Sequence, residues 1–210
     1  MTDFDAVVVA GGRGTRLGGV DKPTIRIGGS TLLERAVAAV RSARTTVVVG
    51  PPRDPVSTDA VQVREEPPAS GPAAAIDAGL SRLDEASDPA PLIVVLAADL
   101  PAAVPAVRAL LASVHPVPTP TVDGWIGTDP DGRRQYLLAA YRTDALRAAC
   151  RSLTAARGSL AGASVRQLLD PLRLVEVPLH PTLTVDVDTP ADLVSAIDRE
   201  AHSDAPPSRA

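Results

Sequence analysis

The sequence is poor in residue types on which several classes of protein depend. Cys150 is the only cysteine in 210 residues, which excludes an internal disulfide framework and a cysteine-based zinc cluster. Aromatic residues make up only 2% of the chain, so a core must consist mainly of Val, Leu, Ile and Ala. That composition favours a parallel sheet covered by helices over an aromatic-rich sandwich. No apolar run approaches the roughly 20 residues that a membrane-spanning helix needs.

Excess positive charge is also missing. The formal net charge is −4 and the isoelectric point is about 5.4, so we expect neither nucleic acid nor an anionic membrane as a partner. Residues 1–6 carry two aspartates and no basic residue ahead of the first apolar run. This start predicts no signal peptide, and hence a soluble, cytoplasmic protein. The sequence makes no prediction about oligomeric state.

Lysine and asparagine are almost absent. Lys22 is the only lysine among 21 basic residues, and there is no asparagine. A lysine kept among so many arginines indicates a position that requires a compact point charge rather than a planar guanidinium. The three histidines, His115, His180 and His202, do not lie in a catalytic pattern, and we expect them to be structural or exposed.

Short apolar runs alternate with amphipathic stretches along the chain. Strands are predicted at 5–10, 46–49, 92–97, 135–141 and 184–187, and helices at 31–43, 72–83, 104–114, 143–153, 164–169 and 190–199. The alternation predicts an α/β protein, with a three-layer α/β/α Rossmann-like fold and a mostly parallel sheet. We expect one domain over residues 1–202 and a disordered tail over 203–210.

A glycine-rich, basic loop over residues 11–23 follows the first predicted strand. Its five glycines allow the backbone to approach a ligand closely, and Arg13, Arg16 and Lys22 supply positive charge. Phosphate groups are the ligands that such loops bind. In α/β folds ligands bind beyond the carboxyl ends of the strands, and Asp99 and Asp188 also follow predicted strands.

Two common phosphate-binding motifs do not fit this loop. The dinucleotide fingerprint has Leu17 in place of its third glycine, and a Walker A loop requires Gly-Lys followed by Ser or Thr, whereas Lys22 lies between Asp21 and Pro23. A nicotinamide-dependent oxidoreductase is therefore a weak alternative.

The run AGGRGTRLGGVDKP (residues 10–23) resembles the signature of MobA-type nucleotidyltransferases, which attach GMP to molybdopterin. Its first part also resembles sugar-phosphate nucleotidyltransferases, but the six-residue step from Arg16 to Lys22 fits the MobA group better. The resemblance continues in four further segments, in the family's order. They are EEPPASGP (65–72), ADLP (98–101), QYLLAAY (135–141) and DVDTPADL (186–193).

The resemblance implies a Mg²⁺-dependent nucleotidyltransferase that uses GTP and a phosphorylated acceptor, with molybdopterin as the leading candidate. Three departures leave the base and the acceptor open: Asp186 and Asp188 replace two asparagines of the family, and Gly50 stands where an asparagine is common. The alternatives are a cytidylyltransferase on molybdopterin, a guanylyltransferase on another phosphorylated small molecule, and a nucleotide-binding regulator without turnover.

The residues and the resemblance together give a set of candidate site residues. Asp99 is the first candidate for a Mg²⁺ ligand and Asp188 the second, with Asp186 as an alternative because residues two apart on a strand share a face. Arg16, Lys22 and Asp99 are the predicted catalytic residues. The predicted nucleotide contacts are Val9, Ala10, Gly11, Gly12, Gly14, Arg16, Lys22, Glu66 and Asp99.

Other polar and aromatic residues have weaker roles in this prediction. Glu66 can accept hydrogen bonds from a guanine base. Arg133, Arg134 and Arg157 suit an anionic acceptor. We expect Trp125 and Tyr141 to fill the core rather than to stack on a ligand.

Overall fold

The computed structural model describes residues 3–12, 19–53, 60–85, 88–114 and 122–203. Within them, one seven-stranded sheet forms the centre of the molecule in the order β5-β4-β1-β6-β8-β7-β9. The strands are β1 (Phe4–Val9), β4 (Thr46–Val49), β5 (Ala60–Val63), β6 (Leu92–Ala97), β7 (Gly124–Thr128), β8 (Arg134–Arg142) and β9 (Leu174–Pro178). β8 alone runs antiparallel to its neighbours, so the sheet is mostly parallel, as predicted.

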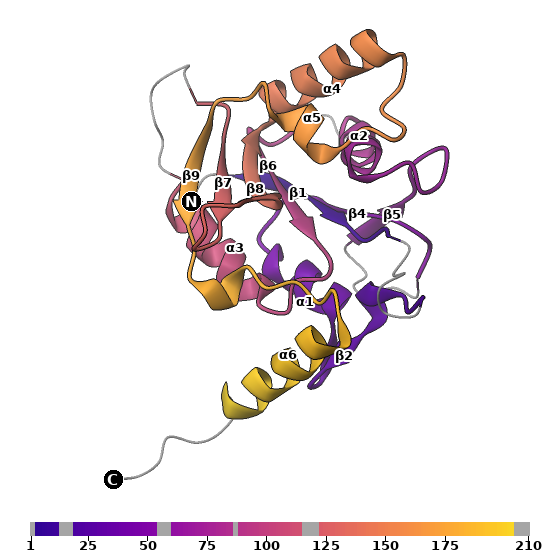
Figure 1. Ribbon diagram of the computed structural model, residues 1–210. Helices are drawn as coiled ribbons and strands as arrows, with labels where there is room; N and C mark the ends of the chain where they lie inside the picture. The colour runs from indigo at the N-terminus through magenta and orange to yellow at the C-terminus, as the bar shows by residue number, and fades with distance from the viewer. Residues whose placement is uncertain (1–2, 13–18, 54–59, 86–87, 115–121, 204–210) are drawn as a thin grey trace.

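Helices cover both faces of this sheet (Figure 1). One face carries α1 (Leu32–Ala39) and α3 (Ala103–Ala112), and the other carries α2 (Pro72–Leu83), α4 (Thr143–Arg157) and α5 (Val165–Leu169). The interior strand β1 is buried along its whole length and packs against both helix layers, because successive side chains point to opposite sides. Phe4, Ala6 and Val8 belong to the first core cluster, and Val7 and Val9 to the second. The three-layer α/β/α prediction is thereby confirmed.

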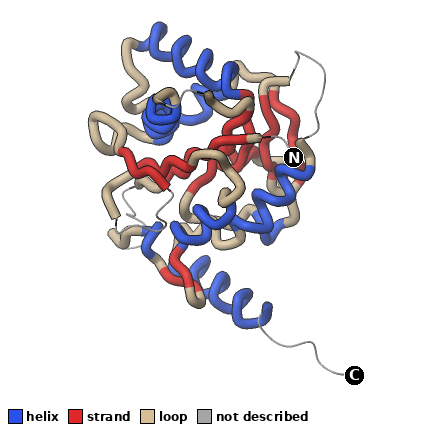
Figure 2. Tube along the Cα trace, turned by 180° about the vertical axis from the view of Figure 1, so that it is seen from behind, coloured by secondary structure: helices blue, strands red, loops and turns tan. Residues whose placement is uncertain are grey.

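A small subassembly lies beside the α1 side of the sheet (Figures 1 and 2). It contains the 3₁₀ helix η2 (Lys22–Thr24), the hairpin of β2 (Arg26–Ile27) and β3 (Ser30–Thr31), and the last helix, α6 (Pro190–Ser203). Its own apolar cluster consists of Ile27, Leu32, Val187 and Ala196. A further 3₁₀ helix, η3 (Pro181–Leu183), lies on the path from β9 to α6.

The predicted strand over 184–187 is wrong. This segment has no strand partner, and Val187 is buried in the cluster with Ile27, Leu32 and Ala196 instead of in the sheet. Alternating polar and apolar residues predicted a strand, but the segment runs past the edge of the sheet. The backbone N–H of Val187 donates to the carbonyl oxygen of Asp99 at 3.1 Å. This single contact ties the segment to the loop after β6.

Three sheet strands, β5, β7 and β9, were not predicted from the sequence. β7 contains two glycines, which weaken a strand signal, yet both are required by close packing. A Cβ at Gly124 would lie 2.7 Å from the carbonyl oxygen of Ala140, and one at Gly127 would lie 2.8 Å from Leu179.

Helix boundaries also differ from the predicted ones. α1 ends at Ala39, four residues before its predicted end. α4 continues to Arg157, where Gly158 caps it in a left-handed conformation.

The aromatic residues take the core role that was predicted. Trp125 is 4% exposed, and Tyr141 is fully buried with its hydroxyl donating to the carbonyl oxygen of Tyr136 at 3.0 Å. His180 is exposed, and its ring accepts a hydrogen bond from the backbone N–H of Thr182 at the start of η3. His115 lies outside the described residues, as does the side chain of His202.

The predicted tail begins at Ser203, which is the last residue of α6, and its remainder, 204–210, also lies outside the described residues. None of the helices in the described part of the chain is both long and apolar enough to cross a membrane.

We predict that Gly79→Ala destabilises the protein although alanine favours helices. Gly79 is a buried residue of α2, and a Cβ there would lie 2.6 Å from one methyl group of Val7 and 2.9 Å from the other. We expect the free energy of unfolding, measured by urea titration, to fall by about 1–3 kcal/mol. Helix propensity alone would instead raise it by about 1 kcal/mol, so a variant more stable than the wild type would contradict the packing.

Candidate active site

The carboxyl ends of three parallel strands meet at the edge of the sheet that carries the predicted site. The chain leaves β1 through Ala10, whose N–H donates to Val49 on β4, while Ala98 at the end of β6 donates to Val9. Between these ends lies a cavity of about 450 Å³. Its walls come from the loop after β1, from α2 and from β8, and its lining residues include Val9, Gly11, Gly12, Pro23, Ala69, Pro72, Ala75, Ala97 and Leu137.

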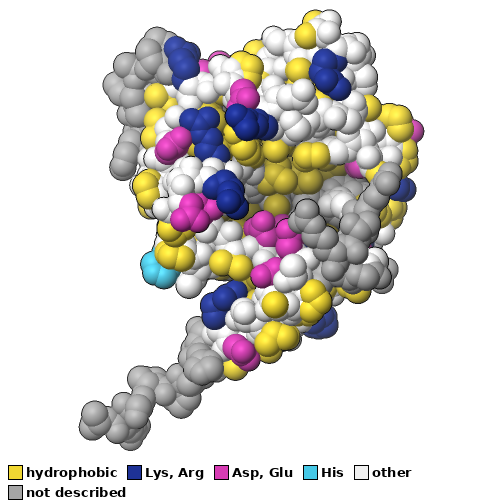
Figure 3. All heavy atoms as spheres, in the orientation of Figure 1, with side chains coloured by type: hydrophobic (Ala, Val, Ile, Leu, Met, Phe, Trp, Pro, Cys, Tyr) yellow, Lys and Arg dark blue, Asp and Glu magenta, His cyan; other side chains and the backbone are white. Residues whose placement is uncertain are grey.

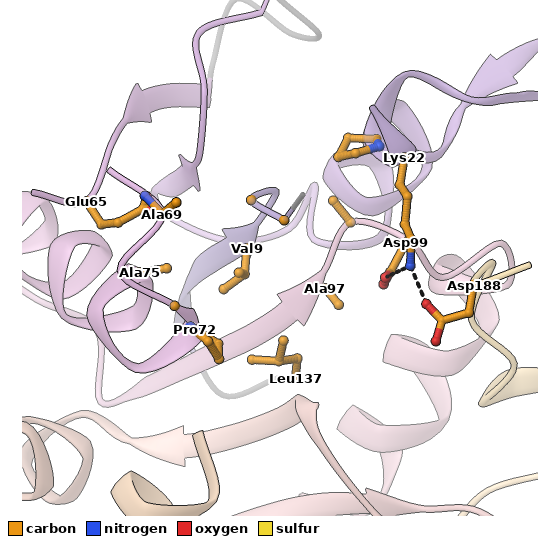
Figure 4. A pocket seen from close by; sticks show the side chains of 15 residues that line it. Val9, Lys22, Glu65, Ala69, Pro72, Ala75, Ala97, Asp99, Leu137 and Asp188 are labelled. Carbon is orange, nitrogen blue, oxygen red and sulfur yellow. Dashed lines mark hydrogen bonds and ion pairs between the residues drawn. The ribbon is translucent and has the colours of Figure 1, made fainter. Parts of the chain in front are cut away.

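Charged residues gather at one end of this cavity (Figures 3 and 4). In the space-filling view, acidic side chains lie at the lower edge of an apolar hollow. The close-up shows Lys22 pointing between Asp99 and Asp188. The Lys22 ammonium lies 3.7 Å from Oδ2 of Asp99 and hydrogen-bonds Oδ1 of Asp188. The three side chains come from η2, from the turn after β6 and from the segment before α6, which are far apart in sequence.

Lys22 is held in place through its neighbours. Asp21 accepts hydrogen bonds from the guanidinium of Arg53 at 2.6 and 2.8 Å. Arg53 in turn exchanges two backbone hydrogen bonds with the side-chain amide of Gln62 on β5. Sequence reasoning missed Arg53, because the Asp21–Arg53 pairing across 32 residues leaves no local pattern.

Asp188 is fixed by the start of α6. The carboxylate of Asp192 accepts hydrogen bonds from the backbone N–H groups of Asp188 and Thr189, and the Thr189 hydroxyl accepts one from Asp192 N–H. This is the capping arrangement that Thr189-x-x-Asp192 predicts. Because Val187 is bonded to the carbonyl oxygen of Asp99, the cap brings Asp188 next to Asp99 without a strand.

The electrostatics of this end favour an additional cation. Burial raises the pKa of Asp99 above its ordinary value, and Asp188 raises it further, against the opposing effect of Lys22. The carboxyl group of Asp186 reaches solvent, but the protein around it, together with Asp99 and Asp188, raises its pKa to about 7. Carboxylates resist ionisation where negative charge is already in excess. One ammonium group therefore does not neutralise the three aspartates.

A metal could satisfy this charge only with help from another ligand. No group of three or more His, Cys, Asp or Glu side chains among the described residues is placed to hold a metal. Asp99 and Asp188 offer two carboxylates, and Mg²⁺ commonly binds one or two carboxylates together with substrate phosphates and water. The donor set thus fits a Mg²⁺ ion that arrives with a polyphosphate.

The opposite end of the cavity contains Glu65, which is only 6% exposed. Its Oε1 accepts a hydrogen bond from the N–H of Ala69 at 2.9 Å, whereas its Oε2 is buried with no hydrogen-bond partner in the described part of the chain. An unpaired buried carboxylate oxygen is costly unless a ligand donates to it. The apolar cavity therefore has a hydrogen-bond acceptor at one end and a mixed-charge cluster at the other.

The structure places Glu66, the predicted base contact, outside this cavity, where it lines a separate surface hollow together with Arg64 and Arg82. Adjacent side chains in an extended segment point to opposite sides, so the two glutamates face different ways. Side chains two residues apart in an extended segment lie on the same side. The alternation of side chains from Val61 and Val63 therefore predicts that Glu65, and not Glu66, faces inward.

Gly50 explains one departure from the family pattern. It follows β4 with φ +157°, and a Cβ there would lie 2.7 Å from the carbonyl oxygen of Ala10 and 3.1 Å from the nitrogen of Gly11. The missing side chain lets the end of β4 approach the backbone of the glycine-rich loop. An asparagine at this position would have to displace Ala10 and Gly11.

The structure brings most of the predicted site residues together. Val9, Gly11, Gly12, Lys22, Asp99 and Asp188 line the cavity. Ala10 is buried directly behind it. Gly14 and Arg16 lie outside the described residues.

The predicted acceptor arginines lie elsewhere. Arg134 forms an ion pair with Glu176 on β9, and Arg133, Arg134 and Arg157 are not among the lining residues of the cavity.

Comparison with known families identifies the family of the chain. The model of the MobA-like NTP transferase domain matches residues 6–175. The chain belongs to this family of nucleotidyltransferases. A protein of Natronomonas pharaonis named "Probable molybdenum cofactor guanylyltransferase" is 27% identical, and the alignment covers 95% of this chain and 99% of the relative. A protein of the same name from Chloroflexus aggregans is 33% identical over 68% of this chain and 67% of its own length.

Solved structures support the same fold at lower identity. A nucleotidyl transferase from Methanothermobacter superimposes with a TM-score of 0.71 at 21% identity, over 97% of this chain and all of the other. The family membership makes the protein a transferase, and Val9, Gly11, Gly12 and Lys22, which lie within the matched residues, line its cavity.

We predict that Lys22→Met lowers the stability of the metal-free protein. Without the ammonium group, Asp99 and Asp188 face each other uncompensated, so the free energy of unfolding in EDTA should fall by about 1–3 kcal/mol. Adding Mg²⁺ should recover part of this loss. The control is Arg44→Met, which breaks an exposed ion pair with Asp88 and should leave the stability nearly unchanged, because exposed ion pairs contribute little. Equal stability of Lys22→Met and the wild type would contradict the charge analysis.

Proposed function

We propose that this protein transfers GMP from GTP to the terminal phosphate of molybdopterin and releases pyrophosphate, in a Mg²⁺-dependent reaction. The observation that carries the proposal is the cluster of Lys22, Asp99 and Asp188 at one end of a cavity whose other end contains Glu65. The two relatives named as molybdenum cofactor guanylyltransferases support the choice of base and acceptor.

The proposed reaction is an in-line displacement at the α-phosphorus of GTP. An oxygen of the acceptor phosphate forms a bond to this phosphorus, and the bond from the phosphorus to the oxygen that bridges the α- and β-phosphates breaks. The electron pair of that bond leaves with pyrophosphate. Because the acceptor phosphate is already anionic at pH 7, the reaction needs no general base, and no histidine is among the described residues that line the cavity.

The chain's contribution is alignment and charge neutralisation. Asp99 and Asp188 would hold Mg²⁺, which when bound neutralises phosphate charge. Lys22 supplies a compact positive charge for the triphosphate and the departing pyrophosphate. The backbone of Gly11 and Gly12 also lines the cavity, where its N–H groups can donate to phosphate or ribose oxygens.

Glu65 replaces Glu66 as the residue proposed to select the base. A carboxylate only accepts hydrogen bonds, and guanine presents two adjacent donors, the N1–H and the 2-amino group. Adenine and cytosine each present an amino group next to a ring nitrogen that is a hydrogen-bond acceptor. This nitrogen would face the second carboxylate oxygen, and the two acceptors would repel each other. The buried, unpaired Oε2 of Glu65 thus favours GTP over ATP and CTP.

The direct test is pyrophosphate release from the purified protein with Mg²⁺, molybdopterin and each of GTP, CTP, ATP and UTP. We expect release with GTP, and its loss in EDTA and in Asp99→Ala. Preference for CTP would keep the transfer reaction and overturn the guanylyl assignment. Nucleotide binding without any release would favour a regulator on the same fold and overturn the enzymatic proposal for this acceptor.

The role of Glu65 has a matched control in the adjacent residue. Glu65→Gln should lower kcat/KM for GTP by about 10- to 100-fold, because the amide cannot accept both guanine donors. Glu66→Gln, which changes a side chain outside the cavity, should leave kcat/KM within a factor of about two. If Glu66→Gln has the larger effect, the orientation of the two glutamates relative to the nucleotide is wrong.

A further inference from the structure

The three charged residues of the site are carried by segments that do not belong to the central sheet. Lys22 begins η2, Asp99 lies in the turn after β6, and Asp188 precedes α6. A displacement of any one segment would separate the ammonium from the carboxylates. The relative positions of these segments therefore need a common support outside the cavity.

Arg35 on α1 makes contact with β2, with the loop after β6 and with α6, in which these three segments continue. Its Nη2 donates to the carbonyl oxygen of Ile27 at 2.6 Å and to Oε1 of Glu200 at 2.5 Å. Its Nη1 donates to Oε2 of Glu200 at 3.1 Å and to the carbonyl oxygen of Pro101 at 3.4 Å. The side chain of Arg35 is only 15% exposed, so water competes little for these hydrogen bonds.

Each acceptor belongs to a stretch of chain that continues from one residue of the site. Ile27 is in the hairpin that follows η2 and Lys22, and Pro101 is two residues after Asp99. Glu200 is on α6, which begins two residues after Asp188. One guanidinium thus joins the three stretches of chain that carry the site residues.

We infer that Arg35 is a positioning residue that holds Lys22, Asp99 and Asp188 in register for binding of the metal–nucleotide complex. This inference rests on the proposed function, because the register matters only if the three residues act on one ligand. Its chemistry is specific to arginine: the planar fork presents several donors in fixed directions, whereas a lysine ammonium is a point charge on a flexible stem.

The packing around the ion pair supports a fixed geometry. A Cβ at Gly28 would lie 3.3 Å from Oε1 of Glu200 and 3.6 Å from Nη2 of Arg35. The tight turn of the hairpin therefore closes over the Arg35–Glu200 pair. The apolar cluster of Ile27, Leu32, Val187 and Ala196 joins the same hairpin to the segments before and within α6. Ionic and apolar contacts thus connect the same elements.

The test compares two arginines that each form an ion pair with a carboxylate. Only the pair of Arg35 joins the stretches of chain that carry the site residues. Arg35→Met and Arg35→Lys remove the guanidinium group that makes these hydrogen bonds. Arg147→Met removes the ion pair between α4 and Asp84 at the far end of α2, where the Arg147 side chain is 20% exposed. For each protein, the dissociation constant of GTP is measured with Mg²⁺ and with EDTA, at a temperature at which all variants are folded, and urea unfolding is followed in parallel.

We expect Mg²⁺ to tighten GTP binding to the wild type and to Arg147→Met by the same factor. In both Arg35 variants this factor should fall by about tenfold, while GTP binding in EDTA changes less, because Glu65 and the glycine backbone remain in place. If Mg²⁺ tightens GTP binding to Arg35→Lys and Arg35→Met by the same factor as in the wild type, the positioning role is overturned and the proposed function stands. This holds even if both variants lose stability as Arg147→Met does. A wild type whose GTP binding is indifferent to Mg²⁺ would overturn the proposed function, and the positioning role with it.

Discussion

The contact of one lysine with two aspartates is the interaction on which the site depends. Lys22 lies between Asp99 and Asp188, and burial and mutual repulsion keep the pKa of Asp99 above its ordinary value. The cluster is therefore held together by a charge that does not fully neutralise it. Such a site gains from a cation and a polyphosphate bound together, because the cation relieves the aspartates while the phosphates engage the lysine. The chain belongs to the family of MobA-like NTP transferase domains, and a nucleoside triphosphate contains such a polyphosphate.

The ends of the sheet strands form the cavity, and segments outside the sheet carry its charged residues. The parallel strands β1, β4 and β6 end at one edge, where Gly50 allows the glycine-rich backbone to lie close against β4. The charged residues, by contrast, are supported from outside the sheet: Asp21 by Arg53, and Asp188 by the cap of α6. This division separates an end of the cavity formed by the sheet from a charged end whose geometry depends on a few long-range ion pairs. If the proposed function holds, sequence changes at Arg35 or Arg53 act on the charged end more than on the sheet.

Periodicity in the sequence predicted the elements whose sequence signal is local. β4, β6 and α2 have the predicted bounds, because apolar runs and an early proline mark them. β7 was missed since its glycines are explained only by contacts with β8 and Leu179, and the strand expected at 184–187 failed since no neighbour pairs with it. At the site, Lys22, Asp99 and Asp188 were predicted from composition, strand ends and the family resemblance. The choice between Glu65 and Glu66, and the roles of Arg35 and Arg53, depend on the direction of side chains and on distant partners that no sequence pattern records.

The most direct measurement of the central claim is a crystal structure of the protein with GTP and Mn²⁺, with the metal located by its anomalous scattering. The account predicts an anomalous peak in contact with the carboxylates of both Asp99 and Asp188, the Lys22 ammonium on a phosphate oxygen, and the guanine edge at the buried oxygen of Glu65. A metal bound away from the two aspartates, or a nucleotide whose phosphates lie outside the cavity, would contradict it.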